Sequence, residues 1–208
     1  MRTIFGLAAT LVLLVSVSGG AAAQKIDGKF RLDGSVPLIE YSSATITFED
    51  TDQEQTVTNT RIGLLESAGI GLGYAVSETV VIGVDLLASY ASENQEDAED
   101  TSETTFGIAP MLEYVVDTGG KVRPAFGIRV GVAAISVSMG DMDTSATHFV
   151  VGAELGAKGF VTNTFSINPC VSFRYIAGSG TADGPGRSTD LSFSGFGVGL
   201  GVDLSGWM

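Results

Sequence analysis

The 208-residue sequence contains one cysteine, one histidine and few cations, and each shortage excludes a class of protein. The single thiol, Cys170, cannot form an internal disulfide, so no disulfide framework holds the chain. Lys and Arg number 11 against 24 Asp and Glu, giving a formal net charge of −13. That balance argues against nucleic acid as a partner, because phosphate binding needs clustered cations.

Long apolar runs are also scarce, and the longest one lies at the start of the chain. A positive start at Met1–Thr3 precedes an apolar run over residues 4–17, and small residues then end in an Ala-x-Ala site at 21–23. This pattern predicts a secretory signal peptide over residues 1–23, cleaved before Gln24, and one mature domain over residues 24–208. A membrane-anchoring helix is the weaker alternative, because it needs roughly 20 apolar residues.

What the sequence has in abundance is glycine, with 28 residues, and strict alternation. From Phe196 to Leu204 every second residue is large and apolar, and the residues between are three glycines and Asp203. Alternation of this kind is typical of a strand with two different faces. Bulky aliphatics opposite glycine and a carboxylate favour a strand with lipid outside and a crowded polar lumen inside.

Seven more stretches share this design, and turn residues or polar segments separate them. The predicted strands are Lys29–Tyr41 (continuing through Ala44–Phe48), Arg61–Tyr74, Val80–Tyr90, Phe106–Val116, Val122–Val132, His148–Lys158, Phe165–Tyr175 and Phe196–Leu204. Long polar loops are predicted at Glu49–Glu54, Ser92–Glu103, Gly140–Asp143 and Gly178–Asp190, with short turns between them. Departures from alternation predict bulges at Glu66 and near Ser194–Gly195. The alternating rhythm indicates an all-β protein, an eight-stranded antiparallel transmembrane up-and-down β-barrel with both termini in the periplasm.

Charged residues on the inward face of these strands form the candidate site. Eight strands leave an interior wide enough for side chains but not for an open channel, and buried charges need partners. We therefore predict a network of ion pairs that plugs the lumen; a gated ion path is the alternative. Its predicted members are Arg31, Asp33, Arg61, Asp85, Glu113, Arg123, Arg129, Glu154, Lys158, Arg174 and Asp203.

Aromatic residues fall near the two ends of the predicted strands, as expected for rings that collect at both membrane interfaces. Those near the short turns are Tyr74, Tyr114, Phe160, Phe165 and Trp207. Those near the long loops are Tyr41, Tyr90, Phe106, Phe149, Tyr175 and Phe193. By simple counting, Trp207 is out of phase with the apolar face of the last strand.

Four segments resemble the small outer-membrane β-barrel domain family, which includes the OmpA-type and OmpX-type barrels. They are Gly71–Val84, Leu112–Gly127, Phe160–Pro169 and the closing Gly197–Trp207, and the similarity covers nearly all of the mature chain. The resemblance implies a porin-like, monomeric protein of the Gram-negative outer membrane. Its implied partners are outer-membrane lipids, lipopolysaccharide and the barrel assembly machinery. The matching motifs carry no catalytic or ligand signature.

The predicted loops are strongly acidic, and this directs the expected function. Close carboxylates attract divalent cations, but no loop has the order of residues found in an EF-hand, so we favour a solvated surface over a calcium site. His148 with Ser145 or Glu154 could serve an enzyme of outer-leaflet lipids, yet no motif accompanies it. We expect no enzyme, cofactor or metal, and a structural or surface-interaction role through acidic external loops. A lipid-modifying enzyme and a narrow ion pore remain the alternatives.

Overall fold

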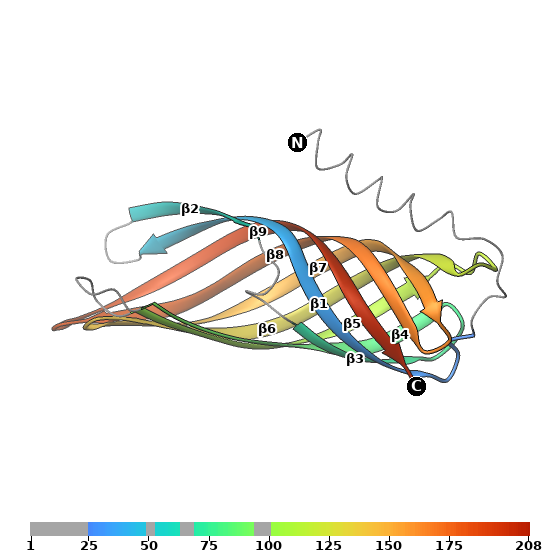
Figure 1. Ribbon diagram of the computed structural model, residues 1–208. Helices are drawn as coiled ribbons and strands as arrows, with labels where there is room; N and C mark the ends of the chain where they lie inside the picture. The colour runs from blue at the N-terminus through green and yellow to red at the C-terminus, as the bar shows by residue number, and fades with distance from the viewer. Residues whose placement is uncertain (1–24, 49–52, 63–68, 94–100) are drawn as a thin grey trace.

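The computed structural model of the chain describes residues 25–48, 53–62, 69–93 and 101–208, whose antiparallel strands close into a barrel (Figure 1). β1 pairs with β9 along nearly its whole length, and this pairing closes the ring. Of the residues described, none lies in a helix long and apolar enough to cross a membrane. The strands are β1 (Phe30–Phe48), β2 (Gln53–Ile62), β3 (Gly69–Ala75), β4 (Val80–Glu93), β5 (Thr101–Val115), β6 (Val122–Met139), β7 (Met142–Thr162), β8 (Phe165–Gly184) and β9 (Arg187–Trp207).

The second position of the barrel is shared by two strands. β3 pairs with Phe30–Ser35 of β1, whereas β2 pairs with Ile39–Phe48 of the same strand. Together they occupy the position for which the sequence predicts the single strand Arg61–Tyr74. The predicted eight-stranded antiparallel barrel is therefore confirmed, with its second strand in two parts. The bulge predicted at Glu66 lies outside the described residues.

Alternation places large apolar side chains on the outer wall, where they are exposed. Phe30 is 62% exposed, Leu72 48% and Leu155 52%. A soluble sheet would bury such a face against a second layer, whereas the outer wall of a membrane barrel presents it to lipid. The outward half of the predicted alternation is thus confirmed.

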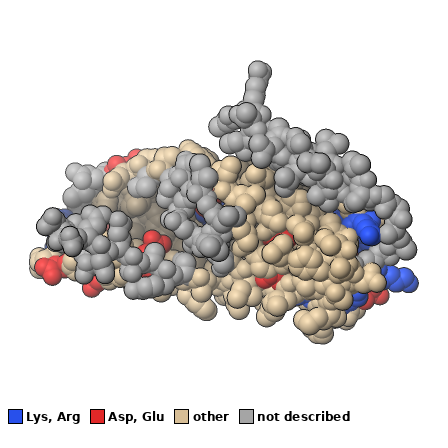
Figure 2. Space-filling model, in the orientation of Figure 1, with Lys and Arg blue, Asp and Glu red and all other residues tan. Residues whose placement is uncertain are grey.

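The two ends of the barrel differ, and we name them by what they hold. The terminal end carries Lys25 onward, the short turns at 76–79, 116–121 and 163–164, and the C-terminus. The loop end carries the remaining connections. In Figure 2 blue cationic groups are most prominent at the terminal end, red acidic groups appear at both ends and in the middle, and most of the visible wall is tan.

At the loop end the strands run further than predicted, so three predicted loops are wrong in extent. β8 and β9 are joined by the tight turn Pro185–Gly186, which replaces the predicted loop Gly178–Asp190, and β6 and β7 are joined by Gly140–Asp141. Gly140 and Gly186 have φ of 56° and 76°, as tight hairpin turns require. Likewise β4 continues to Glu93 and β5 begins at Thr101, within the predicted loop Ser92–Glu103. Small polar residues pair here because strand pairing satisfies the backbone whether or not the side chains are apolar.

Irregular pairing occurs at other positions than the sequence predicts. The register shifts between Pro37 and Ile39 and between Phe160 and Thr162. Proline has no N–H to donate to a ladder, which favours a bulge at Pro37. The bulge predicted near Ser194–Gly195 is wrong, because β8–β9 pairing runs through it without a shift. Phe193 instead points inward, where its ring centroid lies 5.9 Å from that of His148.

Candidate functional site: the charged lumen

Glycines on the inner wall make room for the charged side chains that fill the barrel. A Cβ at Gly71 would lie 2.7 Å from Oδ1 of Asp85, and one at Gly197 would lie 2.9 Å from Nε of Arg174. Real Cβ atoms essentially never show such approaches, so a side chain at either glycine would displace the charged group beside it. The glycine rows of β3 and β9 therefore serve packing: they leave the lumen to long side chains from the neighbouring strands.

The layer of charges nearest the terminal end is fully paired and buried. Nε of Arg31 lies 2.6 Å from Oδ2 of Asp33, and its Nη1 lies 2.8 Å from Oε1 of Glu113. Nζ of Lys158 lies 3.0 Å from Oε2 of the same Glu113. The four side chains are at most 11% exposed. Two cations and two anions thus balance across β1, β5 and β7.

A second layer lies further toward the loop end and centres on Arg129. Its Nη1 lies 2.6 Å from Oε2 of Glu154, and its Nε pairs with Asp85. These groups come from β6, β7 and β4, so the guanidinium links two carboxylates across the barrel interior. The side chains are between 14% and 24% exposed, which makes this layer wetter than the first.

The third ion pair contains only one residue of the predicted network. Arg174 pairs with Glu40, a residue outside the predicted network. Up to Pro37 the odd-numbered residues of β1 face inward, and the bulge there turns the even-numbered Glu40 to the inside. Pro37 within a predicted strand was the available signal. Arg61 stands opposite Glu40 in the β1–β2 register, but its side chain lies outside the described part of the chain.

Arg123 belongs to the terminal end, not to the central network. Its guanidinium lies 3.7 Å from Glu78 and 3.5 Å from Asp117, two residues of the short turns. It also lies 5.8 Å from the centre of the Phe160 ring. Arg123 is buried, and its contacts tie the turns to the barrel mouth.

Asp203 has a different environment from the other predicted anions. Among the described residues, no Lys or Arg nitrogen lies within ion-pair distance of it. Its Oδ2 accepts a long contact of 3.9 Å from the Cys170 thiol. Donor atoms of Glu154, Cys170 and Asp203 all lie within 4.8 Å of one another. Two carboxylates and a thiol are donors that borderline divalent metals accept, so within the described part of the lumen these residues could hold a metal.

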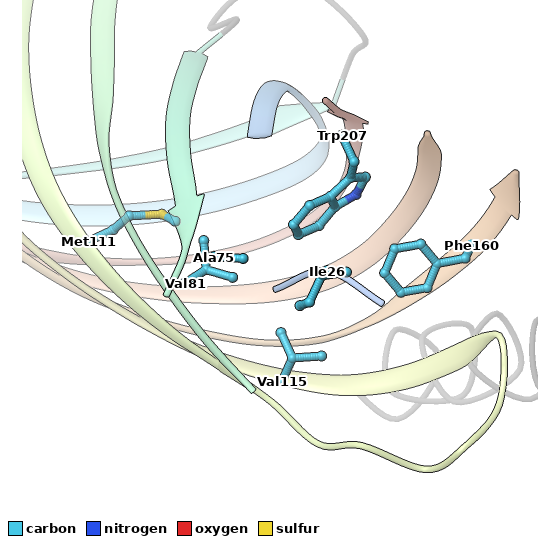
Figure 3. Close-up of a cluster of buried hydrophobic side chains, with 7 residues drawn as sticks. All are labelled: Ile26, Ala75, Val81, Met111, Val115, Phe160 and Trp207. Atoms are coloured by element: carbon cyan, nitrogen blue, oxygen red, sulfur yellow. The ribbon is translucent and has the colours of Figure 1, made fainter. Parts of the chain in front are cut away.

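An apolar cluster seals the terminal end beneath the first charged layer (Figure 3). Trp207 is 1% exposed and points inward, where its Nε1 donates to Oγ of Ser166 at 3.0 Å. Arg31 lies over its ring at 5.6 Å. The prediction that Phe160 and Trp207 belong to an interfacial girdle is therefore wrong, because both rings pack inside the barrel. The cluster comprises Ile26, Ala75, Val81, Met111, Val115, Phe160 and Trp207.

Ile26 is the member that the sequence did not suggest, since it precedes the first strand. It is fully buried, and its N–H donates to Oε2 of Glu78 at 3.1 Å. The following turn is fixed because the N–H of Gly28 donates to the carbonyl of Ala75 at 2.9 Å. The first described residues thus fold into the barrel mouth and help to close it.

Between the charged layers the lumen holds a cavity of ≈ 220 Å³, lined in part by Glu40, Arg129 and Asp203. The arrangement is a wet middle compartment above a sealed base. The catalytic alternative is not assembled in the described residues. Ser145 lies on the outer wall beside Thr181, and Glu154 is bound to Arg129. His148 faces the ring of Phe193 instead.

Comparison with known proteins agrees with this geometry. The sequence model described as the outer membrane protein beta-barrel domain matches residues 7–203. The outer membrane protein OprG of Pseudomonas aeruginosa has a similar structure: 13% identity, 87% of this chain and 97% of that chain covered, and a TM-score of 0.60. Neisserial surface protein A matches at 16% identity, with 86% and 99% covered and a TM-score of 0.49. No curated protein matches the chain. At these identities the likeness to solved structures concerns the fold.

Proposed function

The chain belongs to the outer membrane protein β-barrel domain family, and we propose that within it the protein is a closed scaffold that presents an acidic surface outside the cell. The barrel itself is an outer-membrane structure. The proposed scaffold role rests on how charge is distributed between the barrel interior and the loop end. At the loop end the hairpins of β6–β7 and β8–β9 extend beyond the apolar wall, as the extracellular side of an outer-membrane barrel does, so the loop end is taken to face outward.

The observation that carries the proposal is a pair of like charges held face to face. Asp143 of β7 stands directly opposite Asp183 of β8, and both side chains are exposed on the outer face. Like charges in directly opposite positions of a sheet are destabilising. The nearby Asp141 and Asp190 add to the same negative field. A cationic partner at this surface would remove the repulsion, which favours surface interaction as the role.

The sealed base also supports the closed-scaffold proposal. The apolar cluster and the fully paired layer of Arg31, Asp33, Glu113 and Lys158 fill the terminal half of the lumen. Such a base suits a scaffold better than a passage. The proposal assigns the protein no catalytic step.

Two measurements test the proposal. In planar lipid bilayers, the purified protein is expected to give conductance at the level of protein-free membrane; steady open channels would contradict a closed scaffold. In lipid vesicles, an oligolysine peptide is expected to bind at low ionic strength and to dissociate as salt screens the charges.

A variant with four acidic side chains neutralised tests whether this surface binds the peptide. The combined substitutions Asp141→Asn, Asp143→Asn, Asp183→Asn and Asp190→Asn keep the shapes of the side chains and remove four charges. This variant is expected to lose most of the oligolysine binding. Asp27→Asn, which removes an exposed acid at the terminal end, is the control and is expected to retain it. Equal binding by the fourfold variant and the wild type would overturn the proposal.

A further inference from the structure

The outer wall carries a groove of ≈ 460 Å³ that crosses β5, β6, β7 and β8 in the loop half of the barrel. Its volume falls within the range of sites that hold small molecules. Two cross-strand rows of outward side chains form the groove. The row nearer the terminal end is Phe106, Ala134, Thr147 and Ser179, and the row nearer the loop end is Thr104, Ser136, Ser145 and Thr181.

The chemistry of the groove is unusual for so acidic a chain. Six of these eight side chains are hydroxyls, and the groove has no charged lining residue, although the chain carries a net charge of −13. Oγ of Ser145 and Oγ1 of Thr181 lie 3.4 Å apart, a long contact that leaves their hydrogen-bonding capacity largely unused. Phe106 borders the groove and is 62% exposed. Neutral donors and acceptors beside an exposed aromatic face complement the hydroxyls and C–H faces of a sugar ring.

The position of the groove indicates that the sugar would belong to a lipid. The next row toward the terminal end consists of exposed apolar side chains, among them Ile108, Val132 and Phe149. These belong to the lipid-facing wall, so the groove begins where that wall ends. A lipid whose chains lie along Ile108 and Val132 would place its head group in the groove.

The row beyond the groove argues against a phosphate as the recognised group. There Asp143 and Asp183 face each other, and their charges would repel a phosphate unless a cation lay between them. We propose that the groove binds the sugar head of a glycolipid in the outer leaflet, with Phe106 against the ring and the hydroxyls of Ser145 and Thr181 as hydrogen-bonding partners. This site goes beyond the scaffold role and does not depend on it.

Two variants and two matched controls test the site. Phe106→Ala removes the aromatic face, and Ser145→Ala with Thr181→Val removes two hydroxyls with little change in shape. Phe126→Ala deletes an equally lipid-facing ring of β6 in the terminal half. Thr45→Val with Ser194→Ala deletes a directly opposed hydroxyl pair on the outer face of β1 and β9, outside the groove.

Binding is measured by native mass spectrometry in a detergent without sugar, using a lipopolysaccharide with a truncated sugar chain as the probe. Trp207 fluorescence verifies that each variant is folded, because this sole tryptophan is buried in the barrel. Each groove variant is expected to weaken binding by about tenfold, the effect of one or two lost neutral contacts. Both controls are expected to stay within about twofold of the wild type, well below one lost hydrogen bond.

Competition separates sugar from phosphate recognition. A maltoside detergent shares a sugar head and a hydrocarbon chain with the probe but has no phosphate, and it is expected to displace the probe. Phosphatidylglycerol, which has hydrocarbon chains and a phosphate but no sugar, is not. Removal of divalent cations with EDTA is expected to leave the affinity unchanged. If EDTA abolishes binding and the maltoside does not compete, a cation-bridged phosphate is recognised and the proposal is overturned. Equal affinities for groove variants and controls would overturn it as well.

Discussion

The terminal half and the loop half of this barrel are built from the same alternating strands, yet their interiors have opposite character. In the terminal half, Trp207 and Ile26 pack in a dry cluster beneath charges that are almost fully buried. In the loop half, Arg174 is 47% exposed beside Glu40, and a cavity opens between the layers. Strand alternation therefore decides which side chains face inward, and the residue types decide whether that interior is sealed or wet. We infer that stability is concentrated in the terminal half and interaction in the loop half.

The strongest test of this comparison is the removal of the central anion of the buried layer. Glu113→Ala leaves both Arg31 and Lys158 without their shared carboxylate in a nearly dry interior. Breaking a buried ion pair on one side costs about 3–5 kcal/mol, because the remaining charge stays buried. The free energy of unfolding, measured by urea titration in lipid vesicles with Trp207 fluorescence, is expected to fall by that amount. Glu54→Ala, an exposed acid, is the control; an equal loss in both variants would contradict a buried network.

The apolar cluster gives the next largest effect. Ile26→Ala removes three heavy atoms from a fully buried side chain, and such truncations cost about 2 kcal/mol or more. Val76→Ala, at a residue that is 46% exposed on a short turn, is expected to cost much less. Both are measured by the same urea titration. If the two losses are alike, the first described residues do not contribute to the base of the barrel as the structure indicates.

The wet layer should respond more weakly than the dry one. Glu40→Ala leaves Arg174 without its partner, but water can solvate a guanidinium that is half exposed. The loss in unfolding free energy is expected to be about 1 kcal/mol, near the upper value for exposed ion pairs. A double-mutant cycle with Arg174→Ala measures the coupling directly. A coupling as large as the loss expected for Glu113→Ala would erase the distinction between the halves.

Much of this architecture follows from local pattern. Alternation along Phe196–Leu204 and its counterparts predicts the strands and the outward apolar wall. Period-two patterning is a strong signal because each strand must satisfy two environments at once. A network of inward charges is also predictable, since the interior of an eight-stranded barrel is little wider than the side chains that fill it.

What local pattern could not supply depends on register and on contacts distant in sequence. The bulge at Pro37 turns Glu40 inward, and alternation alone cannot say which residue a bulge will skip. Counting from Phe196 already places Phe193 and Trp207 on the inner face, and pairing in register keeps them there; the expectation of aromatic girdles at the membrane interfaces pointed the other way. Ile26 lies before any periodic segment, so only the assembled barrel mouth reveals its burial. Extension of β8 and β9 into a segment predicted as a loop has the same origin: the ladder, not the composition, keeps it paired.

The smallest prediction has the opposite sign and tests the loop half alone. Asp143→Asn replaces one of two carboxylates that oppose each other across β7 and β8, and the backbone ladder there remains intact. Opposed charges of one sign destabilise a strand pair, so the variant is expected to gain about 0.5 kcal/mol of unfolding free energy. The gain should shrink as salt is raised, because both groups are exposed and screened by ions. Ser138→Ala, on the outer face of β6 directly opposite Asp143, is the control and should change little. A salt-independent loss in Asp143→Asn would mean that the carboxylate stabilises the hairpin, and the repulsion invoked for partner binding would then be absent.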